Sequence, residues 1–214
     1  LSGTENASLI GYGQWNDVVA MSTIGESLYN FYGYEVEGVY ESLQDIMDSP
    51  KPAKYPTDGV FNRSNTVWVG DIKYKDQLTV DSNGDGIPDK GDGVINEKDR
   101  VNLGSPLPLF TFGWTNTFRY KNFDLSIFLN GSYGNKVLNY NSITLTHMNS
   151  PWTNQLNSVN DRAKLVPIDP DKVYADGSKW YDDITNVKVA NSGTKTPRAS
   201  INDPNDNDRI SSRY

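Results

Sequence analysis

Hydrophobic and polar residues alternate along two stretches in the middle of the chain, residues 110–120 and 123–133. In both, apolar or aromatic side chains fall mainly on every second position, with mostly small, polar or charged residues between them. A period of two is typical of a β-strand with one apolar face. Lys121 and Asn122 separate the stretches and predict a two-residue turn. The pattern therefore predicts an antiparallel hairpin over residues 110–133.

The length of the predicted turn determines which residues of the two strands lie opposite each other. The apolar residues then share one face, while the other face carries an opposite-charge pair and a hydroxyl pair. A shift of one residue would move every side chain to the wrong face, so the register is well determined. The predicted pairs are Tyr120 with Phe123, Phe118 with Leu125, Asn116 with Ile127, Trp114 with Leu129, Arg119 with Asp124, and Thr117 with Ser126.

Each predicted strand has about eleven residues, close to the roughly 9–11 that a tilted strand needs to cross the hydrocarbon layer of a membrane. Aromatic residues lie at both ends of the apolar face, as in the aromatic girdles of outer-membrane barrels. The alternative is a soluble β-sandwich, whose strands are usually shorter. One hairpin cannot close a barrel, so a barrel would need further strands outside these 214 residues. We expect an all-β fold: a fragment of an antiparallel transmembrane β-barrel with long extracellular loops.

The remaining segments have weaker patterns. Residues 28–40 alternate like a strand, residues 41–47 predict a short helix that ends before Pro50, and residues 66–74 predict another strand. The expected organisation is barrel strands with an extracellular loop in residues 1–65, an acidic loop region in 66–109, the hairpin in 110–133, and a long polar extracellular loop region in 134–214.

Acidic residues gather between Asp81 and Asp99, where six carboxylates face only two lysines. The spacing from Asp81 to Asp92 matches a calcium-binding loop of the EF-hand type, with a turn-forming glycine at Gly86. A hard cation favours oxygen ligands on alternate residues of a tight loop. The alternative to a calcium site is a solvated acidic turn without metal. If an ion is bound, we expect it to stabilise the loop. The expected Ca²⁺ ligands are Asp81, Asn83, Asp85, Ile87 through its carbonyl group, Asp89 and Asp92, with a second or shared register through Asn96 and Asp99.

Composition excludes several classes of function. The chain has no cysteine and one histidine, which excludes disulfide frameworks, thiol catalysis and multi-histidine metal sites. A net charge of −7 argues against nucleic acid as a partner. No run of about 18 apolar residues predicts a membrane-spanning helix. His147 has no nucleophile motif nearby, so we do not expect an enzyme. The first and last residues suggest a piece of a longer protein.

Several segments of the chain form an ordered set of motifs: residues 33–40, 69–76, the loop from Asp81, Asp99-Arg100, 103–108, 110–113 and 120–135. In this order they resemble the C-terminal part of SusC/RagA-family TonB-dependent outer-membrane proteins. The resemblance covers roughly residues 26–140 and is weak outside that range. The loop is longer than usual for the family, since residues 86–92 look like an insertion, which leaves open which acids bind the ion.

The resemblance implies a plugged barrel, of 22 strands in this family, in the bacterial outer membrane. It implies import of oligosaccharides or peptides with a SusD-like surface lipoprotein, and contact with TonB through a segment outside this chain. The remaining strands and the plug would also lie outside it. The alternative is a secreted, calcium-stabilised β-module that binds glycan or protein at the cell surface. Some aromatic residues in the polar loops are candidate substrate contacts, although ordinary loop packing is the favoured alternative: Trp152, Tyr174, Trp180 and Tyr181.

Overall fold

The computed structural model describes residues 10–11, 18–149 and 152–214, and its contacts divide them into two compact units. Unit 1 comprises the described part of residues 1–32 together with residues 102–138, and unit 2 comprises residues 33–101 and 139–214. The chain therefore passes three times from one unit to the other.

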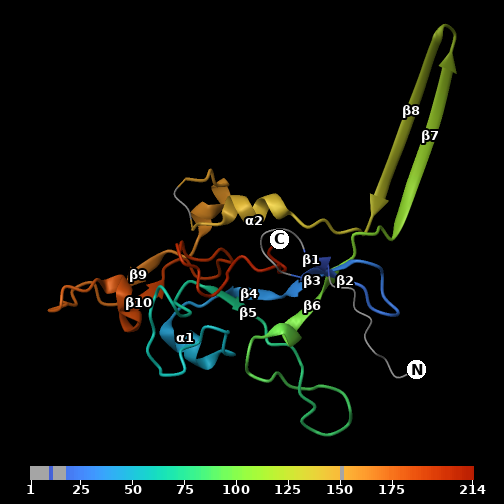
Figure 1. Ribbon diagram of the computed structural model, residues 1–214. Helices are drawn as coiled ribbons and strands as arrows, with labels where there is room; N and C mark the ends of the chain where they lie inside the picture. The colour runs from blue at the N-terminus through green and yellow to red at the C-terminus, as the bar shows by residue number, and fades with distance from the viewer. Residues whose placement is uncertain (1–9, 12–17, 150–151) are drawn as a thin grey trace. The chain divides into compact units, whose positions relative to one another are not determined.

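Most regular elements are short strands, and Figure 1 shows β7 and β8 as a long two-stranded ribbon. The strands are β1 (Ile10–Gly11), β2 (Val18–Met21), β3 (Asn30–Tyr34), β4 (Val36–Val39), β5 (Ile72–Tyr74), β6 (Arg100–Gly104), β7 (Phe110–Tyr120), β8 (Phe123–Tyr133), β9 (Leu165–Pro167) and β10 (Val187–Val189). The helices are α1 (Leu43–Asp48), η2 (Glu97–Asp99), α2 (Tyr140–Thr146), η3 (Asn157–Asp161), η4 (Trp180–Asp182) and η5 (Ile184–Asn186).

The strands form small open sheets. One sheet has the order β1-β2-β3-β6, and the pairs β4–β5, β7–β8 and β9–β10 form two-stranded antiparallel sheets. The mainly β-strand character is confirmed, but within the described residues these sheets do not close into a barrel. Among the described residues, none of the helices has both the length and the apolar character needed to cross a bilayer.

Unit 2 has its own hydrophobic core, to which Val67, Trp68 and Val69 contribute fully buried side chains. The sequence predicts one strand over residues 66–74, but only β5 forms. Trp68 donates its backbone N–H to the Asp71 carboxylate at 2.8 Å, which closes a turn before the strand can begin. The three apolar residues are thus buried by the turn and not by a sheet ladder.

The other local predictions differ from the structure by small amounts. The helix expected over residues 41–47 is α1, with the Ser42 hydroxyl accepting from the backbone N–H of Asp45 at its N-cap. The strand expected over residues 28–40 is divided into β3 and β4. At the division, the backbone of Tyr34 bonds to residues 210 and 212.

Residues 139–214 belong to unit 2 and are more ordered than their polar composition indicates. The pair β9–β10 lies within them, and Val187 is fully buried in the core. Much of the remaining backbone runs in turns and bends, as predicted for a polar loop region. Its location outside the cell stays a prediction.

Candidate functional site

The hairpin of β7 and β8 has the register predicted from the sequence, from Tyr120 opposite Phe123 to Phe110 opposite Tyr133. On its polar face, the Arg119 guanidinium forms an ion pair with Asp124 at 3.0 Å. The hydroxyl groups of Thr117 and Ser126 are 3.2 Å apart. The charge pair and the hydroxyl pair expected across the strands are therefore both present.

Every apolar or aromatic side chain on the apolar face of this hairpin is exposed. Trp114 and Leu125 near the middle of the face are 48% and 56% exposed, and Ile127 is 36% exposed. Such a continuous apolar surface is unusual for a protein surface that faces water. The other exposed apolar or aromatic residues of this face are Phe110, Phe112, Phe118, Tyr120, Phe123, Leu129 and Tyr133.

The acidic loop is organised around Asp81. Its two carboxylate oxygens accept backbone N–H groups from Gly84 and Gly86, each at 2.7 Å. Both glycines have positive φ, which a side chain would disfavour. These bonds hold the pKa of Asp81 below its usual value, with the Gly86 N–H as the main cause. Asn83 accepts the backbone N–H of Asp85 in the same turn.

The other expected ligands of the first register are less well placed. Both carboxylate oxygens of Asp89 bind Ser82, one through its backbone N–H and the other through its hydroxyl group. Ile87 donates its N–H to Asp85. The Asp92 carboxylate accepts from the backbone of Val94. Within the described residues, no three acidic or histidine side chains converge as metal ligands.

The second register lies against Asp76, a residue that the sequence analysis did not single out. Asn96 and Asp99 form a capping box around η2, and Asp99 is fully buried. Asp76 accepts the backbone N–H of Gly93 at 2.9 Å. Burial is the main cause that raises the pKa of Asp76, and the charges of Asp99 and Asp92 add to it. The side-chain oxygens of Asp76, Asn96 and Asp99 suit Ca²⁺ chemically, and in this arrangement at least one oxygen of each accepts a backbone N–H group.

Three of the four candidate aromatic residues lie close together in sequence, at residues 174–181. The rings of Trp180 and Tyr181 meet edge to face with centroids 5.6 Å apart, and Arg63 lies 4.6 Å from the centroid of Tyr181. The Tyr174 hydroxyl donates to Asp183 at 3.0 Å. Trp152 is 92% exposed. The structure therefore gives Tyr174, Trp180 and Tyr181 packing or hydrogen-bonding partners and presents Trp152 to solvent.

A buried ion pair connects the two sequence segments of unit 2. The Arg198 guanidinium contacts the Asp71 carboxylate at 2.8 Å, and the two side chains are 5% and 0% exposed. Asn207 donates its amide to the same carboxylate at 3.2 Å. These residues lie 127 and 136 positions from Asp71, so no local pattern could have identified the contacts.

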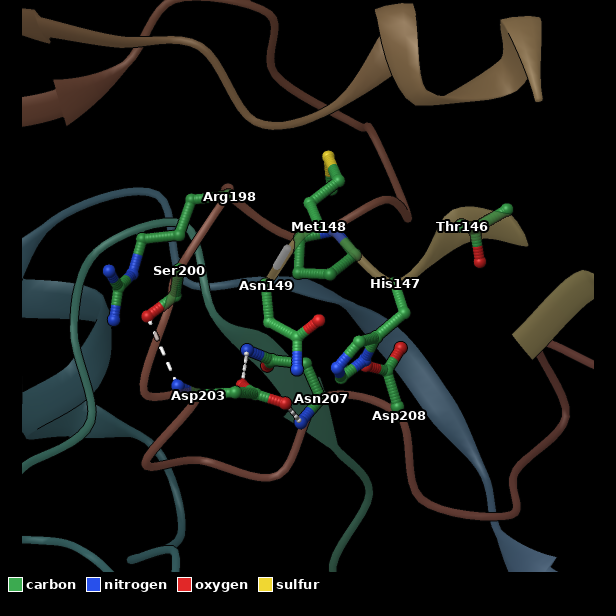
Figure 2. Close-up of a pocket in the computed structure, with 10 residues that line it drawn as sticks. Thr146, His147, Met148, Asn149, Arg198, Ser200, Asp203, Asn207 and Asp208 are labelled. Atoms are coloured by element: carbon green, nitrogen blue, oxygen red, sulfur yellow. Dashed lines mark hydrogen bonds and ion pairs between the residues drawn. The ribbon is translucent and has the colours of Figure 1, made fainter. Parts of the chain in front are cut away.

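Beside this pair lies a cavity of about 10 Å³, enough for about one water molecule. Figure 2 shows His147 next to Asp208, whose carboxylate contacts the imidazole ring, and Asp203 next to Asn207. Burial raises the pKa of Asp203 to about 6, and the charge of Asp71 adds to this effect. Burial lowers the pKa of His147. The single histidine is therefore part of a polar interior.

Comparison with known proteins finds relatives of one class. The chain is 30% identical over 190 residues to TonB-dependent receptor P3 of Formosa agariphila, an alignment that covers 89% of this chain. It is 36% identical over 116 residues, 54% of the chain, to TonB-dependent receptor P26 of the same organism. This chain is related to TonB-dependent receptors. No family model matches it.

The TonB-dependent receptors it matches are much longer proteins, since the chain spans 14% of the first and 9% of the second. The predicted resemblance to TonB-dependent proteins is thus confirmed. The first alignment is longer than the roughly 115 residues over which the sequence motifs resemble the family. Both relatives are named as receptors.

Proposed function

We propose that this chain is a segment of an outer-membrane TonB-dependent transporter in which β7 and β8 are neighbouring strands of the barrel wall. The exposed apolar face of the hairpin is the observation that carries this proposal. Lipid tails would cover that face, while the face bearing Thr117 and Ser126 would line a polar lumen. A secreted β-module would need its own chain to cover the apolar face, and the described residues leave it exposed.

The transported cargo would be an oligosaccharide or a peptide, bound and moved without any covalent bond being made or broken. The motifs that resemble SusC/RagA proteins support a SusD-like lipoprotein as surface partner. The remaining strands, the plug and the TonB contact would be supplied by other parts of the protein. Among the aromatic candidates, Trp152 is the most accessible cargo contact because it is 92% exposed.

Neighbouring residues near the middle of β8 provide a test of this proposal. Ile127 and Ser126 are adjacent but lie on opposite faces. In the complete protein folded in lipid vesicles, Ile127→Lys should lower the free energy of unfolding by about 2–4 kcal/mol, because it puts a charge at the bilayer midplane. Ser126→Lys, which faces the lumen, should cost well under half as much. Urea titration measures both, and equal effects of the two variants would reject the transporter wall.

We further propose that the acidic loop binds Ca²⁺ as a structural ion. The support is the spacing of oxygen-bearing side chains and the glycine turn around Asp81. Asp81 would bind the ion in the first register and Asn96 in the second. In each case the side-chain oxygens would release their hydrogen bonds to loop N–H groups and bind the metal. The ion would stabilise the loop and take no part in transport chemistry.

Calcium titration of the complete protein by calorimetry, after chelator treatment, tests this site. Asp81→Ala should abolish binding if the first register holds the ion, and Asn96→Ala should abolish it if the second does. Asp171→Ala removes an exposed acid elsewhere in unit 2 and should leave binding unchanged. Calcium at about 100 times its dissociation constant should stabilise the protein by about 2.7 kcal/mol. An absence of calcium binding in the unmutated protein would reject the proposal.

A further inference from the structure

A pocket of about 280 Å³ opens beside Arg63 in unit 2, between two segments that are far apart in sequence. The Asn202 amide donates to the Ser64 carbonyl at 3.4 Å, and the Arg198 guanidinium donates to the Arg63 carbonyl at 3.3 Å. These bonds hold residues 198–202 against residues 63–64. None of the described residues that line the pocket is acidic, although the chain as a whole carries a net charge of −7.

The two arginines of this pocket have different roles. Arg198 is buried and its charge is matched by the fully buried Asp71, so it forms a fixed wall. Arg63 is 41% exposed and pairs at 3.3 Å with Asp182, which is itself 46% exposed. An exposed ion pair of this kind is weak, because water screens both charges. A ligand anion can therefore replace Asp182 on Arg63 at little cost.

Neutral hydrogen-bond donors line the same pocket as Arg63. The Ser200 hydroxyl oxygen accepts the backbone N–H of Asp203 at 3.3 Å, a bond that leaves the hydroxyl proton to donate. Ser64 contributes a second hydroxyl group to the lining, and Asn202 contributes an amide. The Tyr181 ring, with its centroid 4.6 Å from the guanidinium, restricts Arg63 on one side. A cation with several neutral donors suits an oxyanion.

We propose that this pocket binds the carboxylate or sulfate group of an acidic saccharide. Its volume lies just below the usual range for small-molecule sites and has room for one sugar unit. None of the described lining residues lies in a strand or a helix, so they offer no strand edge or helical groove for a peptide. This inference rests on the proposed function in one respect only: if the chain is part of a transporter, the acidic saccharide would be its cargo.

Calorimetric titration of the complete, detergent-solubilised protein with glucuronate, galactose 6-sulfate and glucose tests the proposal. The two acidic sugars should bind, and glucose should bind at least about tenfold more weakly, because a charge-assisted bond to Arg63 is lost. Arg63→Gln should weaken binding of the acidic sugars by about tenfold or more. Asp182→Asn should strengthen it by about threefold, since the competing carboxylate is gone.

Arg119→Gln is the matched control, because Arg119 also belongs to an exposed ion pair but lies in the hairpin. It should leave binding within about twofold of the unmutated protein. Asp182→Asn predicts a gain, which a folding defect would not produce. Equal binding of glucose, no loss in Arg63→Gln or no gain in Asp182→Asn would overturn the site. N-acetylglutamate binding as tightly as glucuronate would overturn the saccharide assignment. None of these outcomes depends on lipid contact by the hairpin, so the transporter wall is tested separately.

Discussion

The β7–β8 hairpin and unit 2 are held together by different kinds of interaction. In the hairpin, each residue of β7 pairs with one of β8 through a regular ladder closed by a two-residue turn. In unit 2, side chains bond to backbone groups far along the chain, as when the Asn207 amide oxygen accepts the N–H of Ile72 at 2.7 Å. The hairpin is therefore specified locally, and unit 2 is specified by contacts that span most of the sequence.

The two regions also differ in where their apolar side chains lie. Unit 2 buries an apolar core around Trp68 and matches its buried charges internally. The hairpin leaves its apolar face exposed, and a two-stranded ribbon is at best marginally stable in water. The hairpin therefore gains little stability from its own packing, while unit 2 is stabilised by its own core.

The largest expected contrast concerns two arginine–carboxylate pairs. Arg198→Ala removes the partner of the buried Asp71 and should lower the free energy of unfolding of unit 2 by about 3–5 kcal/mol, because a buried charge is left uncompensated. Arg119→Ala breaks the exposed pair in the hairpin and should cost less than about 1 kcal/mol. Denaturant titration followed by tryptophan fluorescence measures both. Similar losses for the two variants would contradict the contrast.

Two glycines provide the next comparison. A Cβ atom at Gly33 would collide with the backbone carbonyl of Ile210, at the point where Tyr34 donates its N–H to that same carbonyl. Gly33→Ala should therefore cost about 2 kcal/mol, since backbone must move. A Cβ atom at Gly113 in β7 would meet open space. Gly113→Ala should be neutral or stabilising by up to about 1 kcal/mol, and thermal unfolding distinguishes the two.

The same difference determines how much the sequence could predict. The hairpin register follows from alternation over residues 110–133 and from one turn, both visible in a short window. The Asp71–Arg198 pair and the pocket beside Arg63 are not visible there, because polar residues of a loop-rich segment give no sign of which distant backbone they will bind. The strand predicted over residues 66–74 is shortened for a different, local reason: the Asp71 carboxylate accepts the backbone N–H of Trp68 and turns the backbone, which an apolar pattern does not reveal.

The loop illustrates an intermediate case. The spacing of Asp81, Asn83 and Asp85 predicts the tight turn, and their side chains do bind loop N–H groups. Asp76 comes before the motif, and only the fold brings it close to Asp92 and Asp99. Local spacing therefore predicts the shape of the turn better than it predicts the complete set of nearby carboxylates.

The smallest effect we predict is a pH dependence that belongs to unit 2 and involves Asp203. Its carboxylate is surrounded by Asp71, Asp206 and the N–H groups of Asn207, and burial raises its pKa from 3.8 to about 6. A raised pKa favours the protonated form in the folded state. The resulting stabilisation is complete below about pH 4 and is lost as the pH rises through 6. The pKa shift limits this stabilisation of the folded state to about 3 kcal/mol, and we expect about half of that value.

Asp203→Asn removes this ionisation and should flatten the fall in unfolding free energy between pH 4 and pH 7 by about 1.5 kcal/mol. Asparagine also tolerates the positive φ of 37° at this position, so the backbone need not change. Asp171→Asn, at an exposed site of unit 2, should leave the pH profile unchanged. Urea titrations at four pH values measure the slopes. Parallel profiles for the unmutated protein and Asp203→Asn would show that the polar interior of unit 2 does not penalise this charge. The hairpin and unit 2 would then differ in their packing but not in the energetic cost of their charged side chains.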